Sequence, residues 1–313
     1  MEALLNAFVR RVEMEALQVE GIAAADEKRV FYERRFAPDL ARCIYSHTKS
    51  YMAMAAGMAI ADGALDLDAR LTECFPESAP EDAPGSLHEI TLRHLLAMSS
   101  GFGKAYLMIR ERRQGEGTPD YVRYMLSRPM RKAPGTAFDY STADSVLAGR
   151  MIERKTGQNL LEYLYERLFV PLGQGLPVWE CCPKGHPNGG SGLFMRLADM
   201  MRLGQLCLAE GKWQGAQLVE PEWIRQATQA QIDTPPVAED GREETRVENL
   251  WRCGYGYQFW RSPYPQSYRA DGAFGQITTV LPKRGLVVAV QCPETGDFAK
   301  VRRALHEEVL SRL

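Results

Sequence analysis

The chain has 313 residues, of which 45% are hydrophobic and 25% are charged, and its formal net charge is -2. This is the composition of an ordinary globular protein, and the length permits one large domain or two interlocked ones. The near-neutral charge gives no support for binding to nucleic acid or to a membrane surface, and no apolar run is long enough to span a bilayer.

The N-terminal segment, residues 1–20, mixes arginine and glutamate with apolar residues in the pattern of an amphipathic helix. It has neither the apolar core nor the cleavage site of a signal peptide, so we expect a cytoplasmic protein. The seven cysteines are odd in number and scattered along the chain. That distribution favours reduced thiols over a disulfide framework.

Strands are predicted next, over residues 17–25 and 29–36, and together they form a hairpin. A helix rich in small and apolar residues follows and runs from Ser46 to about Asp62. The middle of the chain is mostly helical, and helices are predicted over 90–98, 119–126, 143–156, 160–168, 196–210 and 221–229.

In the C-terminal third of the chain, the spacing of hydrophobic residues changes from that of helices to that of strands. The polar segment 234–248 is predicted to be a surface loop or partly disordered. Strands are predicted after it, over 254–260, 268–270, 276–281 and 286–291. The turn Pro282-Lys283-Arg284-Gly285 joins the last two strands, and an amphipathic helix that carries Phe298 closes the chain.

This order of elements predicts an α+β fold. Strands at both ends of the chain most simply share one antiparallel sheet, which forms a three-layer α/β/α arrangement with helices packed on it. Residues 1–64 and 230–313 would form this α/β subdomain, and residues 65–229 a mostly helical subdomain inserted into it. We expect one integrated unit with the active site at the junction.

The helix that begins at Ser46 places a serine and a lysine three residues apart, Ser46 and Lys49. Residues i and i+3 share a helix face, so the hydroxyl and the amine are within reach of each other. The helix is too apolar to be solvated, and burial would lower the pKa of Lys49 until its neutral amine could take the serine proton. Because Ser-x-x-Lys also arises by chance in many chains, other motifs must support this interpretation.

Further motifs follow in a particular order: Ile90-Thr91-Leu92-Arg93-His94-Leu95-Leu96 with Ser99-Ser100-Gly101, Pro134-Gly135-Thr136-x-Phe138-x-Tyr140-Ser141, Leu168-Phe169-Val170-Pro171-Leu172-Gly173, Gly190-Ser191-Gly192-Leu193 and Gly285-Leu286-Val287-Val288-Ala289-Val290. In this order and spacing, the chain resembles the serine β-lactamase and penicillin-binding-protein-like superfamily, in particular class C β-lactamases and their esterase and amide-hydrolase relatives. The resemblance covers almost the whole chain and implies a β-lactamase/transpeptidase-like fold.

The resemblance also assigns catalytic roles. Ser46 would be the acylated nucleophile, and Lys49 its proton acceptor or the group that keeps a neighbouring base deprotonated. Tyr140 occupies the position of the family's catalytic tyrosine, and a lysine cation beside it would favour the phenolate as a base. Because such groups titrate together, the proton is not assigned to one of them. The backbone N–H groups of Ser46 and Ala273 would form the oxyanion hole, and Gly272 would let the backbone come close.

Two departures from the family pattern affect the expected substrate. Thr142 stands where the family has an asparagine, so a hydroxyl replaces an amide. Ala270-Asp271-Gly272 stands where the family has Lys-Thr-Gly, so no cation is expected there, although Arg269 is adjacent. In the family that cation lies near the carboxylate of penicillin-type substrates, and its loss argues against β-lactams. Asp271 itself would receive a substrate amine or be an exposed acid at a strand end.

Several aromatic residues lie on loops or strand ends near the expected cleft, where they would line an apolar acyl pocket or pack in the core: Phe102, Tyr106, Trp179, Tyr257, Trp260 and Tyr264. Lys155-Thr156-Gly157 spells the third family motif, but it follows a helix and is interpreted as a basic helix end with a C-cap glycine. Residues 181–186 contain two cysteines and a histidine without a second ligand pair, so neither a metal nor a cofactor is expected.

The sequence therefore predicts a serine hydrolase that cleaves an ester or amide bond of a small-molecule substrate through an acyl-enzyme on Ser46. Water, or an acceptor alcohol or amine, would then take the acyl group. A β-lactam-binding protein or a β-lactamase is the alternative, and a non-catalytic scaffold is a third possibility. The sequence leaves the physiological substrate and the oligomeric state open.

Overall fold

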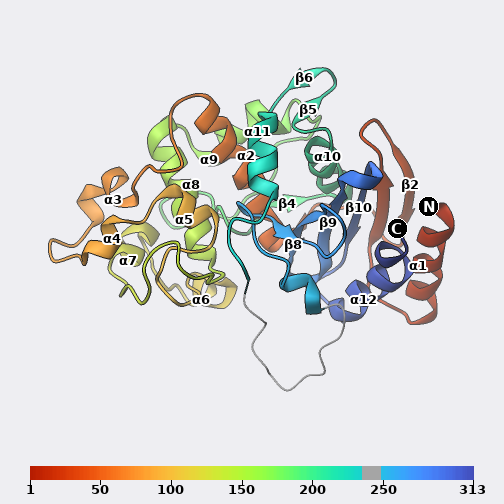
Figure 1. Cartoon of the computed structure of the whole chain (residues 1–313). Helices are drawn as coiled ribbons and strands as arrows, with labels where there is room; N and C mark the ends of the chain where they lie inside the picture. Colours follow the sequence, from red (N-terminus) through yellow and green to blue (C-terminus); the bar gives the residue numbers. More distant parts are fainter. Residues whose placement is uncertain (235–247) are drawn as a thin grey trace.

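A six-stranded antiparallel sheet forms one side of the molecule in the computed structural model, which describes residues 1–234 and 248–313 (Figure 1). The strand order is β2-β1-β10-β9-β8-β7, so strands from both ends of the chain share the sheet. The strands are β1 (Gly21–Ala25), β2 (Val30–Arg35), β7 (Trp260–Arg261), β8 (Tyr268–Gly272), β9 (Gln276–Leu281) and β10 (Leu286–Gln291). The predicted α+β class is thereby confirmed.

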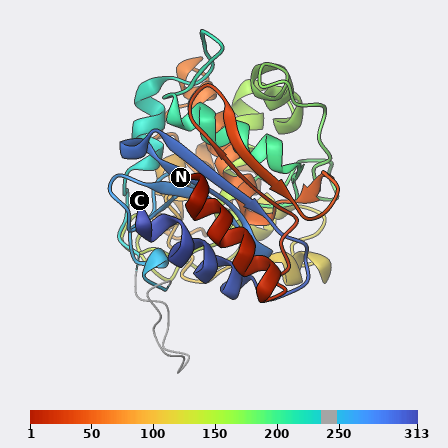
Figure 2. The same ribbon diagram turned by 90° about the vertical axis from the view of Figure 1, so that its right-hand side faces the viewer.

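Helices cover both faces of this sheet. α1 (Glu2–Met14) and α12 (Phe298–Glu308) pack on one face, where Figure 2 shows them crossing in front of the strands, and α10 (Leu197–Leu208) packs on the other. Alternate residues of the central strands serve the two faces: Ala24 and Val288 contact the α1 side, whereas Ala23 and Val287 join the core on the α10 side. Burial on both faces explains why β1 and β10 are almost continuously apolar.

The predicted division of the chain needs one correction. The predicted helical subdomain, 65–229, includes α10, but α10 packs on β10, β9 and β1 and therefore belongs to the sheet part. The other helices are α2 (Thr48–Ala61), α3 (Leu71–Cys74), α4 (Gly85–His88), α5 (Leu92–Leu96), α6 (Ile109–Arg113), α7 (Tyr121–Leu126), α8 (Thr142–Thr156), α9 (Leu160–Leu164) and α11 (Pro221–Thr228). One hydrophobic core runs through both parts.

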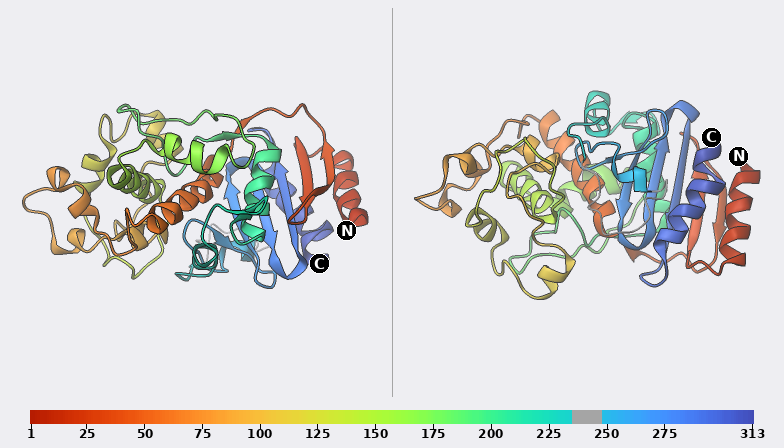
Figure 3. Two further views of the ribbon diagram at one scale, coloured as in Figure 1. Left: turned by 90° about the horizontal axis from the view of Figure 1, so that it is seen from above. Right: turned by 60° about the horizontal axis from the view of Figure 1, so that its bottom comes forward.

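α2 runs between the helical part and the sheet (Figure 3). It contacts α8 on one side and β8 on the other, and nearly all of its residues are buried. Gly57 is required for this position, because a Cβ atom there would lie 2.2 Å from the indole of Trp223. The nucleophile predicted at the start of α2 therefore lies at the junction of the two parts.

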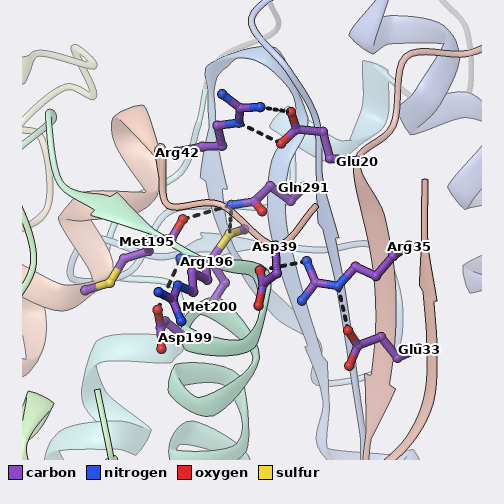
Figure 4. A network of polar contacts seen from close by, with 10 residues as sticks. All are labelled: Glu20, Glu33, Arg35, Asp39, Arg42, Met195, Arg196, Asp199, Met200 and Gln291. Atoms are coloured by element: carbon purple, nitrogen blue, oxygen red, sulfur yellow. Dashed lines mark hydrogen bonds and ion pairs between the residues drawn. The ribbon is translucent and has the colours of Figure 1, made fainter. Parts of the chain in front are cut away.

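The segment that leads into α2 is held by polar contacts at the edge of the sheet (Figure 4). β3 (Arg42–Cys43) pairs with β4 (Phe194–Met195), and Arg42 makes an ion pair with Glu20 at 2.6 Å. The side chain of Gln291, at the end of β10, donates a hydrogen bond to the carbonyl of Met195 at 2.9 Å. These contacts fasten the two-stranded ribbon to the main sheet just before Ser46.

The strand predicted over 254–260 is wrong except at its last residue. Gly254 and Gln258 have positive φ angles of 90° and 66°, so the backbone turns instead of extending. The N–H groups here bond outside the sheet, for example Tyr257 to the carbonyl of Ala227 and Gln258 to that of Leu96. The segment thereby links the sheet to the helical part. Most of the loop predicted over 234–248 lies outside the described residues.

Candidate active site

Ser46 lies in a 3-10 turn, η1 (Tyr45–His47), directly before α2. Tyr45 has a φ angle of 48°, which is uncommon for a residue with a bulky side chain and indicates a strained turn. Packing holds the turn in this conformation, since the Tyr45 ring lies 4.9 Å from that of Phe274, just after β8. The turn presents Ser46 to a large cavity.

Lys49 lies within reach of Ser46, as the helical spacing predicts. Its Nζ is 3.3 Å from Ser46 Oγ and donates a hydrogen bond to the carbonyl of Gly190 at 2.6 Å. The side chain is almost fully buried, and this burial, together with the nearby Arg112 cation, lowers the pKa of Lys49 from 10.5 to about 7. A substantial fraction of Lys49 is therefore a neutral amine at neutral pH. Gly190 must lack a side chain, because a Cβ there would lie 3.0 Å from Nζ.

Tyr140 precedes α8 and completes this group. Its ring lies 5.3 Å from that of Trp260, and Lys49 Nζ lies 5.1 Å from the centre of the Tyr140 ring. Burial raises the pKa of Tyr140, although the neighbouring Ser46 and Trp260 act in the opposite direction. Desolvation therefore works against a phenolate at Tyr140. Lys49 is the group that loses its proton most readily.

The end of β8 forms the opposite wall. A Cβ on Gly272 would lie only 2.1 Å from the carbonyl oxygen of Ile44 and 3.1 Å from the backbone nitrogen of His47, so glycine lets β8 pass directly against the nucleophile turn. Ala273 follows and lines the same cavity as Ser46. The two residues predicted to form the oxyanion hole thus face one space.

Asp271 is neither an exposed acid nor a free receptor for a substrate amine. It is buried between two guanidinium groups: Arg269 Nε lies 2.9 Å from one carboxylate oxygen, and Arg302 Nη2 lies 2.5 Å from the other. Arg302 comes from α12 and lines the main cavity. The expectation that this wall lacks a cation is therefore wrong, since the guanidinium arrives from a distant helix.

The main cavity has a volume of about 760 Å³ and is lined by Ser46, Ala105, Met108, Phe138, Asp139, Tyr140, Thr234, Trp251, Trp260, Asp271, Gly272, Ala273, Phe298 and Arg302. Of the six predicted aromatic residues, Trp260 is in this lining. Sequence reasoning missed Phe138, Trp251 and Phe298 as wall residues. Phe138 lies inside a motif that was recognised, so its place two residues before Tyr140 was a usable signal.

Three other predicted substrate contacts lie outside this lining. Phe102 is buried in the hydrophobic core. Trp179 is also buried, and its indole donates hydrogen bonds to the carbonyls of Asn188 and Ser191 at 2.9 and 3.1 Å, which holds the segment that carries Gly190. Thr142 is buried with its hydroxyl directed at Met108 Sδ, 3.3 Å away.

Three further observations concern the alternatives. Gly157 ends α8 with a φ angle of 71°, which confirms the prediction of a C-cap at Lys155-Thr156-Gly157. Within 1–234 and 248–313, no cluster of three or more histidine, cysteine or acidic residues is arranged to hold a metal ion. In the same ranges, no helix is both long and apolar enough to cross a membrane.

Comparison with known proteins places this site in context. The family described as Beta-lactamase matches residues 11–310. The chain is 36% identical over 140 residues to the esterase EstB of Burkholderia gladioli, and 34% identical over 148 residues to the lovastatin esterase of Penicillium rubens. Each alignment covers 41% of this chain, and the chain spans only 36% and 37%, respectively, of the length of these relatives.

A solved structure agrees over nearly the whole chain. The LovD6 mutant of simvastatin synthase from Aspergillus terreus superposes with a TM-score of 0.70 over 97% of this chain and 94% of its own, at 20% sequence identity. At that identity the likeness establishes the fold and leaves the activity open. It confirms the predicted β-lactamase/transpeptidase-like architecture.

Proposed function

Since this chain belongs to the Beta-lactamase family, we propose that it is a serine hydrolase that cleaves an ester or amide bond through an acyl-enzyme on Ser46. The observation that carries the proposal is the buried Lys49 amine, with a pKa of about 7, lying 3.3 Å from Ser46 Oγ at the edge of a large open cavity. The names of the two esterase relatives favour an ester as the substrate.

Acylation follows from the positions of these groups. Neutral Lys49 takes the proton of the Ser46 hydroxyl while Oγ attacks the substrate carbonyl carbon. The N–H groups of Ser46 and Ala273 hold the oxyanion, and each such donor typically contributes about 3 kcal/mol. As the C–O or C–N bond breaks, the proton on Lys49 passes to the leaving group. Tyr140 stays a neutral phenol, which orients the serine and relays this proton.

Deacylation repeats the same proton transfers with water. A water molecule gives a proton to Lys49 and attacks the acyl carbon, and the proton then returns to Ser46 Oγ as the acid is released. An alcohol or an amine in place of water would make the reaction an acyl transfer. The largely apolar wall of Phe138, Trp251, Trp260 and Phe298 suits an aliphatic or aromatic part of the substrate.

Hydrolysis of short-chain p-nitrophenyl esters tests the proposal. We expect turnover by the intact chain, covalent labelling of Ser46 by a fluorophosphonate probe, and loss of both in Ser46→Ala, with kcat reduced about a thousand-fold or more. Mass spectrometry of the labelled protein locates the modified residue. A folded protein that neither hydrolyses the esters nor reacts with the probe would instead support a non-catalytic scaffold.

A β-lactam-binding function is the second candidate, and Arg302 is the observation that favours it. Its guanidinium lines the main cavity and restores a cation to a wall that lacks the family's lysine. A chromogenic cephalosporin measured beside the p-nitrophenyl esters separates the two candidates. Faster hydrolysis of the cephalosporin would favour the second candidate, whereas turnover of the ester alone supports the first.

A further inference from the structure

A second cavity, of about 380 Å³, lies next to the nucleophile turn. Its wall contains neighbours in sequence of the residues that line the main cavity, because Tyr45 precedes Ser46 and Ile109 follows Met108. Ser191 also lines it and directly follows Gly190, whose carbonyl binds Lys49. The two cavities therefore border neighbouring residues of the nucleophile turn and of the segment 108–109.

The second cavity differs from the main one in the polarity of its wall. Four charged side chains line it, Arg112, Arg113, Glu180 and Glu294, together with the amide of Asn188. The main cavity, by contrast, is walled largely by aromatic rings. Such a difference between adjacent spaces suits a substrate whose two ends differ in polarity.

Arg112 is the buried charge of this wall, and its counter-ion is held only loosely. Its side chain is only 7% exposed, and one nitrogen, Nη1, donates a hydrogen bond to the carbonyl of Leu107 at 2.6 Å. Its counter-ion, Glu180, is half exposed and lies 3.6 Å from Nη2, which is longer than a normal hydrogen bond. A buried guanidinium with so loose a partner is a ready site for a second anion, because a carboxylate can bind it through two parallel hydrogen bonds.

The other charged side chains of the wall do not cancel the charge of the buried Arg112. Arg113, Glu180 and Glu294 are exposed, and water and salt screen exposed charges. The buried Arg112 cation therefore dominates the potential where the cavity approaches the nucleophile.

Asn188 adds a polar contact in the same wall. It is 3% exposed, and its Oδ1 has no hydrogen-bond partner among the described residues. This oxygen only accepts hydrogen bonds and therefore cannot bind a carboxylate, which also only accepts. Because the amide group has both donors and an acceptor, it can present an N–H to a ligand oxygen.

We propose that the second cavity is a substrate subsite that binds a carboxylate, with Arg112 as its buried cation and Asn188 as a second polar contact. This inference rests on the proposed hydrolase function. It narrows the substrate to an ester or amide with a carboxylate on one side of the scissile bond and an apolar part on the other. The carboxylate occupies the second cavity, and the apolar part lies against the aromatic wall of the main one.

Two pairs of chromogenic or aromatic esters of matched size test the subsite. In the first pair, p-nitrophenyl valerate is compared with the mono-p-nitrophenyl ester of glutarate, which carries a carboxylate on the acyl side. In the second, phenyl valerate is compared with 4-(valeryloxy)benzoate, which carries it on the leaving group. In one of the two pairs we expect a higher kcat/KM for the charged ester, and the pair that shows it identifies the side of the substrate that the cavity receives.

Arg112→Gln identifies the residue responsible. We expect it to lower the charged-to-neutral ratio of kcat/KM in the preferred pair about tenfold or more, the usual effect of losing a charge-assisted hydrogen bond. The ratio is the informative quantity, because Arg112 also lowers the pKa of Lys49 and its loss changes the turnover of both esters together. Arg110→Gln, on an exposed residue of the same helix, is the matched control and should leave the ratio unchanged.

Competition gives an independent measurement. Free glutarate should inhibit hydrolysis of the neutral ester by the unmodified chain, and inhibition should weaken in Arg112→Gln by the same factor as the ratio. An equal ratio in the unmodified chain and in Arg112→Gln, or equal turnover of charged and neutral esters in both pairs, would overturn the subsite. Turnover of p-nitrophenyl valerate and labelling of Ser46 would persist in that case, whereas their absence would instead refute the hydrolase function.

Discussion

The two walls of the main cavity both bury charged groups, but they deal with the charge in opposite ways. On the nucleophile wall, Lys49 is almost fully buried beside the Arg112 cation, and the buried acid that it senses, Asp144, has its pKa raised to about 8 by desolvation. Lys49 therefore has no ionised partner at neutral pH. On the β8 wall, Asp271 lies between Arg269 and Arg302 and has an ion pair with each.

The difference shows how burial can produce either reactivity or rigidity. A buried cation without an anion gives up its proton readily, because leaving water costs an ammonium ion much more free energy than it costs a neutral amine. Buried ions that are paired and hydrogen bonded keep their charge and their positions. Lys49 is thereby suited to the role of base that we propose for it, whereas the Arg269–Asp271–Arg302 group becomes a scaffold that holds α12 against the end of β8.

Replacement of Lys49 should have the largest effect. Lys49→Met keeps the length and burial of the side chain but removes the amine that takes the serine proton. We expect kcat for p-nitrophenyl esters to fall about a thousand-fold, within the usual range for loss of a general base. In the unmodified chain, kcat/KM should rise with pH through about 7, where half of Lys49 has lost its proton, and level off at higher pH. Residual activity with the same pH profile in Lys49→Met would assign the proton transfer to another group.

Breaking the ion pairs of Asp271 on the β8 wall should lower the free energy of unfolding. Asp271→Asn removes the charge that two buried guanidinium groups share, and loss of one partner of a buried ion pair typically costs about 3 kcal/mol or more. Urea denaturation measures this change, with Asp82→Asn in an exposed loop as the control. Because Arg302 is then unpaired, adding Arg302→Met to Asp271→Asn should recover part of the loss. Additive effects of the two substitutions would mean that the pair does not act as a unit.

The two walls also differ in how well the sequence predicts them. Ser46 and Lys49 are three residues apart on one helix, so local geometry alone predicts their contact. Asp271 and Arg302 are 31 positions apart, and their contact depends on how α12 lies across the sheet. No local pattern around Phe298 distinguishes an arginine that faces the cavity from one that faces solvent. The cation of the β8 wall therefore became visible only in the structure.

The fold shows the same limit. β9 and β10 were predicted to the residue, because Pro282–Gly285 marks the turn between two apolar runs. The segment 254–260 has the composition of a strand, but its N–H groups bond to carbonyls of the helical part, and tertiary contacts override its propensity. Trp179 likewise looked like a cleft residue, although its indole is used to hold the loop around Gly190.

The smallest expected effect is on the contribution that Lys49, on the nucleophile wall, makes to the stability of the protein. Burial lowers the pKa of Lys49 from 10.5 to about 7, so between these values the unfolded chain binds a proton that the folded chain does not. Unfolding is then favoured by lower pH, and the contribution of Lys49 to stability rises from about pH 7 towards pH 10.5. Lys49→Met should remove this rise, so its stability relative to that of the unmodified chain should be highest at pH 6 and fall by about 2 to 3 kcal/mol by pH 9. Urea denaturation of both proteins across this range measures the change, and Lys283→Met, in the exposed β9–β10 turn, is the matched control. Parallel pH profiles for Lys49→Met and the unmodified chain would show that Lys49 keeps its proton in the folded state, and the contrast between the two walls would then fail.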